Sequence, residues 1–456
     1  LQEMYTFLTF SEKKDYNPKG FCYSFKDLDG KPTQVAIQQD SQEFLNNFCD
    51  KIEYCLRNTK FKYLISDIFT GKTCSSVLCD SCKHISNRFE DFYNLTLEVK
   101  NLKNLNESLN KLILPEIIDD FKCSNCNKNV RISKITSLSK LPNVLIIHLK
   151  RFYLNYETFQ TNKINSKFEF PQTINLKEFC AEEILKNYIK KKDNTEINND
   201  VIYTHEDEYY KYELKGINVH SGGAYGGHYY SFIDVERDGI NNIMNDKTKN
   251  NWLIFNDSNI SEFDTDKIPN ECFGGIIGNN ILEKSQNAYL LIYERKKKVP
   301  IRISLDEKEI KNNVDIIKLN KENKFKIYQD YDLSRDNNNI NEKKLYEKIF
   351  LDEDKKDYFK FIPYYNIPKY VSKKYYKKVM NDNKKSTSFK SGYELFLISK
   401  YKKIILKKEK EEREIDLNEN QKYYKLLNND NKLYFLSMVF SDFNSKIKSK
   451  VNWEQK

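Results

Sequence analysis

The 456-residue sequence has few cysteines and no long apolar run, and each shortage excludes a class of protein. Ten cysteines are too sparse for a scaffold held together by disulfide bonds. The short apolar runs would not span a bilayer, so we expect no membrane partner. Residues 1–10 lack the charged-then-apolar order of a signal peptide, and there is no initiator methionine. We therefore expect the chain to begin inside a longer protein.

Positive charge is also scarce over most of the chain. The net charge is +10, but residues 1–300 hold 40 Lys and Arg against 41 Asp and Glu, whereas residues 301–456 hold 36 against 25. Nucleic-acid sites need clustered positive charge. We therefore expect no nucleic-acid partner, and a zinc-ribbon nucleic-acid binder is the weakest of the functional hypotheses.

The chain does contain enough apolar side chains for a sizeable core, with 39% hydrophobic and 14% aromatic residues. Residues 38–56 are predicted to be a helix, because apolar residues at spacings of one, three and four form one buried stripe. Either Asp40 or Ser41 would be its N-cap. Residues 144–149 are an apolar run, interrupted only by His148, after a proline, which is typical of a buried strand.

Three stretches have a more polar composition. Residues 181–209 are rich in Asn, Lys, Asp and Glu and are predicted to be a surface insertion with some disorder. A second insertion is expected at about 236–250. Beyond residue 298 the composition shifts to Lys, Asn and Tyr, with helical periodicity at 393–405. We expect one domain over residues 1–298 and a separate region over 299–456 that is helical or partly disordered.

Four of the cysteines form two C-x-x-C pairs, which is a metal-ligand spacing. The pairs are Cys79 with Cys82 and Cys123 with Cys126. Two such knuckles can complete a tetrahedral Zn²⁺ site, and four thiolates leave no open position for water, so the zinc would be structural. We expect two β-hairpins between the pairs. The alternative is four unrelated buried cysteines.

A glycine-rich turn precedes one of the five histidines, His228. Glycines at 226 and 227 would let another backbone approach the imidazole closely. About 25 residues later, Asn256 and Asp257 offer an amide and a carboxylate that could accept from the Nδ1–H of the ring and set its tautomer. This is the orienting role in a Cys-His-Asn arrangement. A lone histidine is more often a satisfied core residue, so the local pattern leaves both interpretations open.

A third motif lies at the start of the predicted helix, where Asp40 and Glu43 follow two glutamines. Acidic groups at a helix start act as caps and favour the helix dipole. The functional alternative is that Asp40 and Glu43 recognise a basic peptide.

Taken together, these motifs resemble the ubiquitin-specific protease family of ubiquitin carboxyl-terminal hydrolases, over about residues 1–296. The resembling segments occur in the family's order: its Q-D-A-x-E-F-L helix at 39–45, its L-P-x-V-L-x-I-x-L-K-R-F strand at 141–152, the segment that follows at 167–171, the histidine box at 212–232, its continuation at 252–257, and the closing A-Y-x-L-x-Y strand at 288–293. The C-x-x-C pairs fall where the family's zinc-bearing fingers lie. Residues 272–275 look closest to the large fat-facets-like subgroup.

The resemblance implies an α+β fold, the papain-like cysteine protease hand with palm, thumb and fingers. The zinc-bearing β fingers, at about residues 61–135, would grip ubiquitin, and a cleft would take its tail, which ends in Gly-Gly. The partners would be ubiquitin and ubiquitinated proteins. His228 would activate the nucleophile and protonate the leaving amine, Asn256 would orient His228, and Asp257 would assist polar stabilisation.

The resemblance also implies ubiquitin contacts. Gly226 and Gly227 would form a channel that only a glycine tail can thread, and Tyr229 follows them. Asp40 would contact the arginine-containing tail, with Glu43 beside it on the helix.

One family motif is missing: the nucleophile segment G-x-x-N-x-G-x-x-C-Y-x-N. Cys22 lacks the surrounding asparagine and second glycine, and it lies too close to the helix at 38–56. We therefore expect a thumb that is cut off at its start. The leading hypothesis is a thiol-dependent deubiquitinase with its nucleophilic cysteine outside this chain, and the alternative is a catalytically inactive ubiquitin-binding module, a pseudoenzyme. Paired cysteines kept as thiolates indicate a reducing compartment, the cytosol or the nucleus.

Overall fold

The computed structural model describes residues 1–11, 13, 16–26, 30–32, 38–184, 205–235, 251–277, 282–312, 349–352, 357–362 and 372–385. The chain divides into two compact units, of which unit 1 contains residues 1–35, 237–245 and 369–456 and unit 2 contains residues 36–236 and 246–368. The predicted insertion at 236–250 and the helical periodicity at 393–405 lie outside the described residues, as does most of the insertion at 181–209. None of the helices in the described ranges is long and apolar enough to cross a membrane.

Unit 1 is helical where it is described. Its helices are α1 (Gln2–Phe10), α2 (Lys19–Ser24) and α12 (Lys373–Lys385). Helix α1 packs against α12, with the rings of Phe10 and Tyr376 edge to face at 5.2 Å and an ion pair between Glu3 and Lys378. An edge-to-face ring pair adds about 1 kcal/mol beyond the area it buries.

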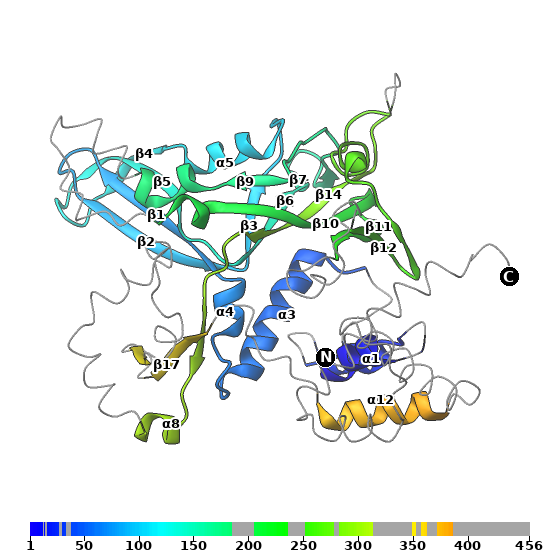
Figure 1. The fold of residues 1–456 in the computed structure, drawn as a ribbon. Helices are drawn as coiled ribbons and strands as arrows, with labels where there is room; N and C mark the ends of the chain where they lie inside the picture. Colours follow the sequence, from blue (N-terminus) through cyan, green and yellow to red (C-terminus); the bar gives the residue numbers. More distant parts are fainter. Residues whose placement is uncertain are drawn as a thin grey trace, which may run out of the picture. The chain divides into compact units, whose positions relative to one another are not determined.

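Over its described residues, unit 2 is an α+β structure with four sheets (Figure 1). Its strands are β1 (Gly71–Cys79), β2 (Ile85–Phe92), β3 (Asn94–Glu98), β4 (Glu116–Lys122), β5 (Asn129–Lys140), β6 (Val144–Lys150), β7 (Phe152–Asn155), β8 (Gln160–Lys163), β9 (Thr173–Asn175), β10 (Lys211–Gly223), β11 (Gly226–Asp234), β12 (Trp252–Asn256), β13 (Asn259–Glu262), β14 (Gln286–Arg295), β15 (Ile301–Ser304), β16 (Ile349–Asp352) and β17 (Asp357–Ile362). Its helices are α3 (Ser41–Leu56), α4 (Leu64–Ile68), α5 (Leu105–Ile113), α7 (Ile268–Cys272) and α8 (Glu307–Lys311), with 3₁₀ turns η1 (Lys177–Phe179), η2 (Asp207–Tyr210) and η3 (Thr265–Lys267).

The central sheet has the order β13-β12-β11-β10-β14-β6-β3, with β9 also pairing with β10. The apolar run predicted as a buried strand is β6, which pairs antiparallel with β14 and parallel with β3. Ile147, Ile217 and Leu291, from three neighbouring strands, are all 0% exposed. Burying each such side chain stabilises the fold by roughly 1.5–3 kcal/mol, so this sheet is a rigid support for what it carries.

The finger sheet is the separate four-stranded sheet β2-β1-β5-β4, and it holds both C-x-x-C pairs. The expectation of two β-hairpins between those pairs is wrong. After β2 the chain enters the central sheet as β3, forms α5, and returns to the fingers as β4. Leu105 and Leu109 bury one face of α5 against the central core, which explains the detour. Figure 1 shows the finger sheet and strands β11 and β12 at opposite ends of unit 2.

Helix α3 begins where one of the two predicted caps places it. The Asp40 Oδ1 atom accepts hydrogen bonds from the backbone N–H groups of Gln42, at 2.7 Å, and Glu43, at 3.1 Å. Such a cap stabilises a helix by about 1 kcal/mol. Ser41 instead donates from its hydroxyl to Asn218 on β10 at 3.1 Å, which ties the start of α3 to the central sheet.

Unit 2 continues past residue 298, the predicted domain boundary, into a small sheet with the order β15-β17-β16. This strand content differs from the helical or partly disordered region expected from composition. Ile301 is fully buried in a cluster with Ile68, Val144 and Ile146, so the segment after residue 298 shares the core of the preceding domain.

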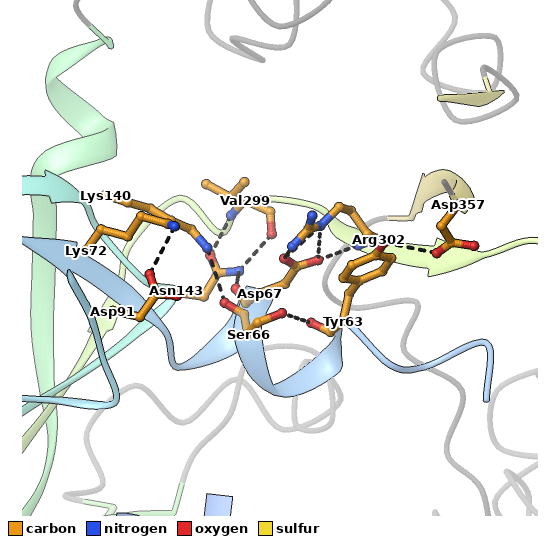
Figure 2. Close-up of polar contacts among 10 residues, drawn as sticks. All are labelled: Tyr63, Ser66, Asp67, Lys72, Asp91, Lys140, Asn143, Val299, Arg302 and Asp357. Atoms are coloured by element: carbon orange, nitrogen blue, oxygen red, sulfur yellow. Dashed lines mark hydrogen bonds and ion pairs between the residues drawn. The ribbon is translucent and has the colours of Figure 1, made fainter. Parts of the chain in front are cut away.

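A polar network holds this small sheet to α4 (Figure 2). The Arg302 guanidinium contacts both carboxylate oxygens of Asp67, with Nη2 at 2.7 Å from Oδ1 and Nε at 3.1 Å from Oδ2. Asn143 fixes the segment that leads into β15, because its side-chain amide donates to the carbonyl of Val299 and accepts from the N–H of Val299. Asp357 accepts from the hydroxyl of Tyr63 at 2.9 Å. A bidentate Arg–carboxylate contact is among the stronger hydrogen-bonded pairs, so it fixes direction as well as position.

Candidate active site and candidate metal centre

The turn between β10 and β11 is built from glycines for two different reasons. Gly222 has a φ of +117°, which side chains rarely adopt, and a Cβ there would meet the Cα of Gly227 at 2.6 Å. Gly227 has room for no side chain, since a Cβ would lie 2.3 Å from the Ser221 carbonyl oxygen and 2.5 Å from the ring of His220. Gly226, in contrast, faces open space. The glycine run therefore lets two backbones and a buried histidine ring pack directly together.

The residue after this turn is His228, near the start of β11, and the partner it meets comes from β12. Ser231 pairs with Phe255 across the two strands. Continuing that register places Asn256 opposite Tyr230 and diagonally across from His228, on the same face. Asn256 Oδ1 lies 2.7 Å from His228 Nε2, which is a hydrogen bond. The His228 side chain is 43% exposed, so it is held in place and still reachable from solvent.

The nitrogen that bonds to Asn256 differs from the sequence expectation. That expectation named Nδ1, but the structure brings Nε2 to the amide oxygen. Because Asn256 lies diagonally across from His228, its side chain reaches Nε2 at the far end of the imidazole rather than Nδ1, which is nearer to the backbone. An amide oxygen can only accept, so Nε2 carries the proton and Nδ1 carries the lone pair. A neutral His228 thus presents Nδ1 as its basic atom.

Asp257 follows in the two-residue turn between β12 and β13, with a φ of +50°. Its Oδ2 lies 3.7 Å from His228 Nε2, and its side chain is 78% exposed. This distance is too long for a hydrogen bond, and exposure screens the charge. Asn256 is therefore the direct partner, and Asp257 supplies a carboxylate near the same edge of the ring.

The other predicted contacts gather near the start of α3. Tyr289 on β14 donates from its hydroxyl to Asp40 Oδ2 at 2.5 Å. Burial, together with this bond to a carboxylate, raises the pKa of Tyr289. The ring of Tyr229 lies 5.8 Å from that of Tyr289. Burial, and next the charge of Asp40, raise the pKa of Tyr229 to about 12. Glu43 is exposed on the first turn of the helix. Asp40 thus serves as a cap and also accepts from a tyrosine.

One residue of the site was not singled out from the sequence. Gln38 accepts a hydrogen bond from the backbone N–H of Gly227 at 2.7 Å, through its side-chain oxygen. Gln38 belongs to the segment that leads into α3, so this bond links the helix start to the glycine turn. A glutamine two residues before a helix cap was the available signal, but nothing local indicates that its partner lies 189 residues away.

Three buried thiols of unit 2, those of Cys49, Cys180 and Cys272, are poorly suited to act as nucleophiles. Burial, with repulsion from Asp50, raises the pKa of Cys49 to about 11, and burial also raises the pKa of Cys180 and Cys272. A nucleophilic cysteine needs the opposite shift. Cys22 lies on α2 in unit 1.

The four predicted metal ligands come together at the tip of the finger sheet. All four Sγ atoms lie within 4.8 Å of one another. Across the knuckles, Cys79 is 4.0 Å from Cys126 and Cys82 is 3.8 Å from Cys123. Thiolates about 2.3 Å from a tetrahedral zinc ion would be about 3.8 Å apart. The cluster could therefore hold a metal, and its donor set and spacing fit zinc.

The two knuckles have the same local construction. In each, the backbone N–H of the residue four positions after the first cysteine donates to that cysteine's carbonyl, at 2.9 Å for both Lys83 and Asn127. Both residues have a left-handed backbone, with φ of 59° and 54°. Asparagine tolerates that conformation well, and each turn brings the second cysteine back beside the first.

Residues 1–293 match the sequence profile of the ubiquitin carboxyl-terminal hydrolases. Because the match covers well over half of the chain, the protein belongs to this family. Its papain-like hand has its fingers in the sheet β2-β1-β5-β4 and its palm in the central sheet that carries His228.

Several family members are similar in sequence. Human ubiquitin carboxyl-terminal hydrolase 34 is 32% identical over 310 residues, which is 65% of this chain and 8% of that protein. The Drosophila melanogaster hydrolase puf is 30% identical over 333 residues, with the same coverages of 65% and 8%. The probable hydrolase FAF of Drosophila melanogaster is 30% identical over 323 residues, covering 66% of this chain and 11% of that protein. The chain thus spans only about a tenth of the length of these relatives.

Among solved structures, the SAGA Ubp8/Sgf11/Sus1/Sgf73 DUB module bound to ubiquitin aldehyde contains a chain with 26% sequence identity and a TM-score of 0.43. The similarity covers 57% of this chain and 50% of that chain.

Proposed function

We propose that this protein is a thiol-dependent deubiquitinase that hydrolyses the bond after the C-terminal glycine of ubiquitin, with its nucleophilic cysteine outside the present chain. The observation that carries the proposal is the 2.7 Å contact between His228 Nε2 and Asn256 Oδ1 beside a turn that admits no side chain at Gly227. Membership of the hydrolase family supports the reaction class.

The reaction would use His228 as base and then as acid. Nδ1 takes the proton of the incoming thiol, whose sulfur bonds to the carbonyl carbon of the ubiquitin tail. Asn256 holds the ring and supports the imidazolium through Nε2. When the carbon–nitrogen bond breaks, His228 returns the proton to the leaving lysine amine. Water then hydrolyses the thioester and releases the ubiquitin carboxylate and the thiol. Asp257, whose Oδ2 lies 3.7 Å from His228 Nε2, would assist polar stabilisation near the ring.

Ubiquitin would be the binding partner, alone and in ubiquitinated proteins. The glycine turn at 226–227 would take the Gly-Gly tail, because bulkier residues would meet its backbone. Asp40 and Glu43 lie at the start of α3, just after Gln38, which contacts Gly227, and Tyr229 follows that glycine by two residues. The two acidic groups suit a basic tail. The thiolates Cys79, Cys82, Cys123 and Cys126 would hold one structural Zn²⁺ that ties the finger strands together.

The compartment we propose is the cytosol or the nucleus. Thiolate ligands and a catalytic thiol both require reducing conditions. Fluorescence imaging of the full-length tagged protein, with a secreted fraction assayed beside it, tests this proposal. A protein found mainly in the secretory pathway would contradict it.

The experiment that tests the function is hydrolysis of a ubiquitin C-terminal reporter by a protein extended upstream of residue 1. His228→Ala should abolish turnover while ubiquitin binding survives, and Asn256→Ala should lose less because it orients rather than reacts. His84→Ala is the matched control, since that histidine side chain is exposed on a finger knuckle. Near-normal turnover by His228→Ala would overturn the proposal.

The second candidate is a ubiquitin-binding module without activity. The observation that favours it is the absence of a nucleophile motif from the 456 residues together with the buried state of Cys49, Cys180 and Cys272. Ubiquitin binding without turnover in the extended protein would support this candidate. Restored, thiol-sensitive turnover would eliminate it.

A further inference from the structure

Lys163, the last residue of β8, makes an unusual set of contacts beside the glycine turn. Its ammonium nitrogen lies 2.6 Å from the carbonyl oxygen of Ser285, 2.9 Å from that of His220 and 3.1 Å from that of Gly222. It also lies 2.8 Å from Nδ1 of the His220 ring. These four acceptors come from the ends of β10 and β14, where the pairing of the two strands stops at Ser221 and Gln286.

An ammonium group is well matched to such a position. It has three protons for these four acceptors, so two acceptors share one proton, and together they satisfy carbonyl groups that the end of a ladder would leave without partners. Hydrogen bonds from a charged donor are roughly twice as strong as neutral ones. Lys163 therefore fastens the β7–β8 hairpin to the end of β10. A second tie runs beside it, since the Thr161 N–H donates to the hydroxyl of Tyr225 in the β10–β11 turn at 3.1 Å.

The hydrogen bond from Lys163 to His220 connects these contacts to the backbone next to His228. Because Lys163 donates to Nδ1, the proton of a neutral His220 resides on Nε2. That edge of the ring faces Gly227, where a Cβ would come within 2.5 Å of Nε2. The ring is held on its other sides by Phe152 and Tyr229, at centroid distances of 5.2 and 4.8 Å. Gly227 is bonded directly to His228, so the ring supports the backbone from which the candidate base projects.

The surroundings lower the pKa of both partners, which keeps His220 neutral but weakens the hold of Lys163 on its proton. Burial, followed by the charge of Lys163, lowers the pKa of His220 to about 4, so this histidine stays neutral at physiological pH. Burial, with repulsion from Arg151, lowers the pKa of Lys163 to about 7. Asp40 and His228 are the other charged or titratable groups that act on His220.

We propose that Lys163 is a positioning residue for the candidate active site: by donating to His220 Nδ1 and to the carbonyl ends of β10 and β14, it sets the tautomer of His220 and the path of the glycine turn that would receive the ubiquitin tail and carry His228. The part that concerns ubiquitin rests on the proposed function. The part that concerns His220 and His228 depends only on the chain.

The first measurement is nitrogen NMR of the full chain labelled at histidine. In the wild-type protein at pH 6.5, His220 should show a protonated Nε2 and a hydrogen-bonded, unprotonated Nδ1. Lys163→Met removes the donor at nearly constant length, so the His220 tautomers should redistribute and the His228 signals should shift. Lys163→Arg keeps a charged donor and should restore most of the wild-type pattern. Lys150→Met, at an exposed pair with Glu98, should change neither histidine.

The second measurement is ubiquitin affinity by calorimetry with the same four proteins. Losing hydrogen bonds from a charged donor should weaken binding by about tenfold in Lys163→Met, with Lys163→Arg closer to wild type. Wild-type protein that fails to bind ubiquitin would count against the proposed function, while the NMR result would still decide the role of Lys163.

Two results would overturn the inference. One is a wild-type His220 whose Nδ1 carries the proton, and this needs no variant, so it decides the matter even if Lys163→Met does not fold. The other is a folded Lys163→Met protein with unchanged His220 and His228 signals. A redistributed His220 tautomer that Lys163→Arg reverses would support it.

Discussion

The strongest stability prediction concerns the ion pair between Arg302 and Asp67, which joins β15 to α4 (Figure 2). The side chains are 20% and 9% exposed, so the pair is largely shielded from water. The guanidinium carbon of Arg302 lies 4.1 Å from the centroid of the Tyr63 ring. Arg302→Met would remove the guanidinium and keep much of the apolar part of the side chain. It would leave the Asp67 carboxylate with the backbone N–H of residue 302 as its remaining donor from that strand.

The expected cost follows from that burial. Breaking one side of a buried pair costs about 3–5 kcal/mol because a charge is left without its partner. The remaining backbone hydrogen bond and the partial exposure of Arg302 place this pair at the lower end. We expect Arg302→Met to lower the free energy of unfolding of unit 2 by about 3 kcal/mol. Asp67→Asn should cost less, and the double variant should reveal a coupling of about 2 kcal/mol.

The assay is urea unfolding of the full chain with hydrogen exchange read at the amides of α4 and β15. Lys360→Met is the matched control, since Lys360 lies on β17 of the same sheet and its pair with Glu309 is longer, at 3.7 Å, and more exposed, at 36% and 33%. That control should change stability by less than about 1 kcal/mol. Equal effects of Arg302→Met and Lys360→Met would refute the claim that the buried pair holds the sheet to α4.

Three further predictions test other parts of the structure. Metal analysis of purified protein should find about one zinc per chain, and Cys82→Ser should lower that content and unfold the fingers, whereas disulfides between the pairs would contradict a metal site. Burial opposes ionisation of Asp357, but hydrogen bonds from Lys62, Ser304 and Tyr63 outweigh it and lower its pKa. The resulting stabilisation of the fold is present above the unfolded pKa of about 3.9 and is lost as pH falls below it. Asp357→Asn should therefore flatten the acid limb of the stability curve, and an unchanged limb would count against the assignment. Gly227→Ala should shift the His228 NMR signals and destabilise unit 2 by about 1–3 kcal/mol, because the added Cβ would clash with the backbone. In the control Gly223→Ala, the added Cβ meets nothing within 4 Å, so neither change is expected. Similar effects of both substitutions would show that close approach is not the reason for glycine at 227.

Much of the fold and part of the site could be read from short segments. The stripe of apolar residues predicts α3, the apolar run predicts β6, and the two C-x-x-C spacings predict the cysteine cluster at the finger tip. These succeed because their information is local: a helix period, a buried run or a knuckle turn depends on residues a few positions apart. The importance of His228 also followed from its neighbours in sequence.

Tertiary structure alone decided the features that depend on strand register and on distant partners. The register of β11 and β12 determines that Asn256 contacts Nε2 of His228 rather than Nδ1. The contact between Gln38 and Gly227 joins residues that are 189 positions apart in the sequence. Composition indicated a separate tail, yet Ile301 and Arg302 belong to the core and polar network of unit 2. Nothing in the local sequence distinguishes Lys163 from a surface lysine, and its contacts with acceptors at the ends of β10 and β14 are visible only in the structure. No local pattern encodes such contacts, because they arise only when the whole sheet has brought the strand ends together.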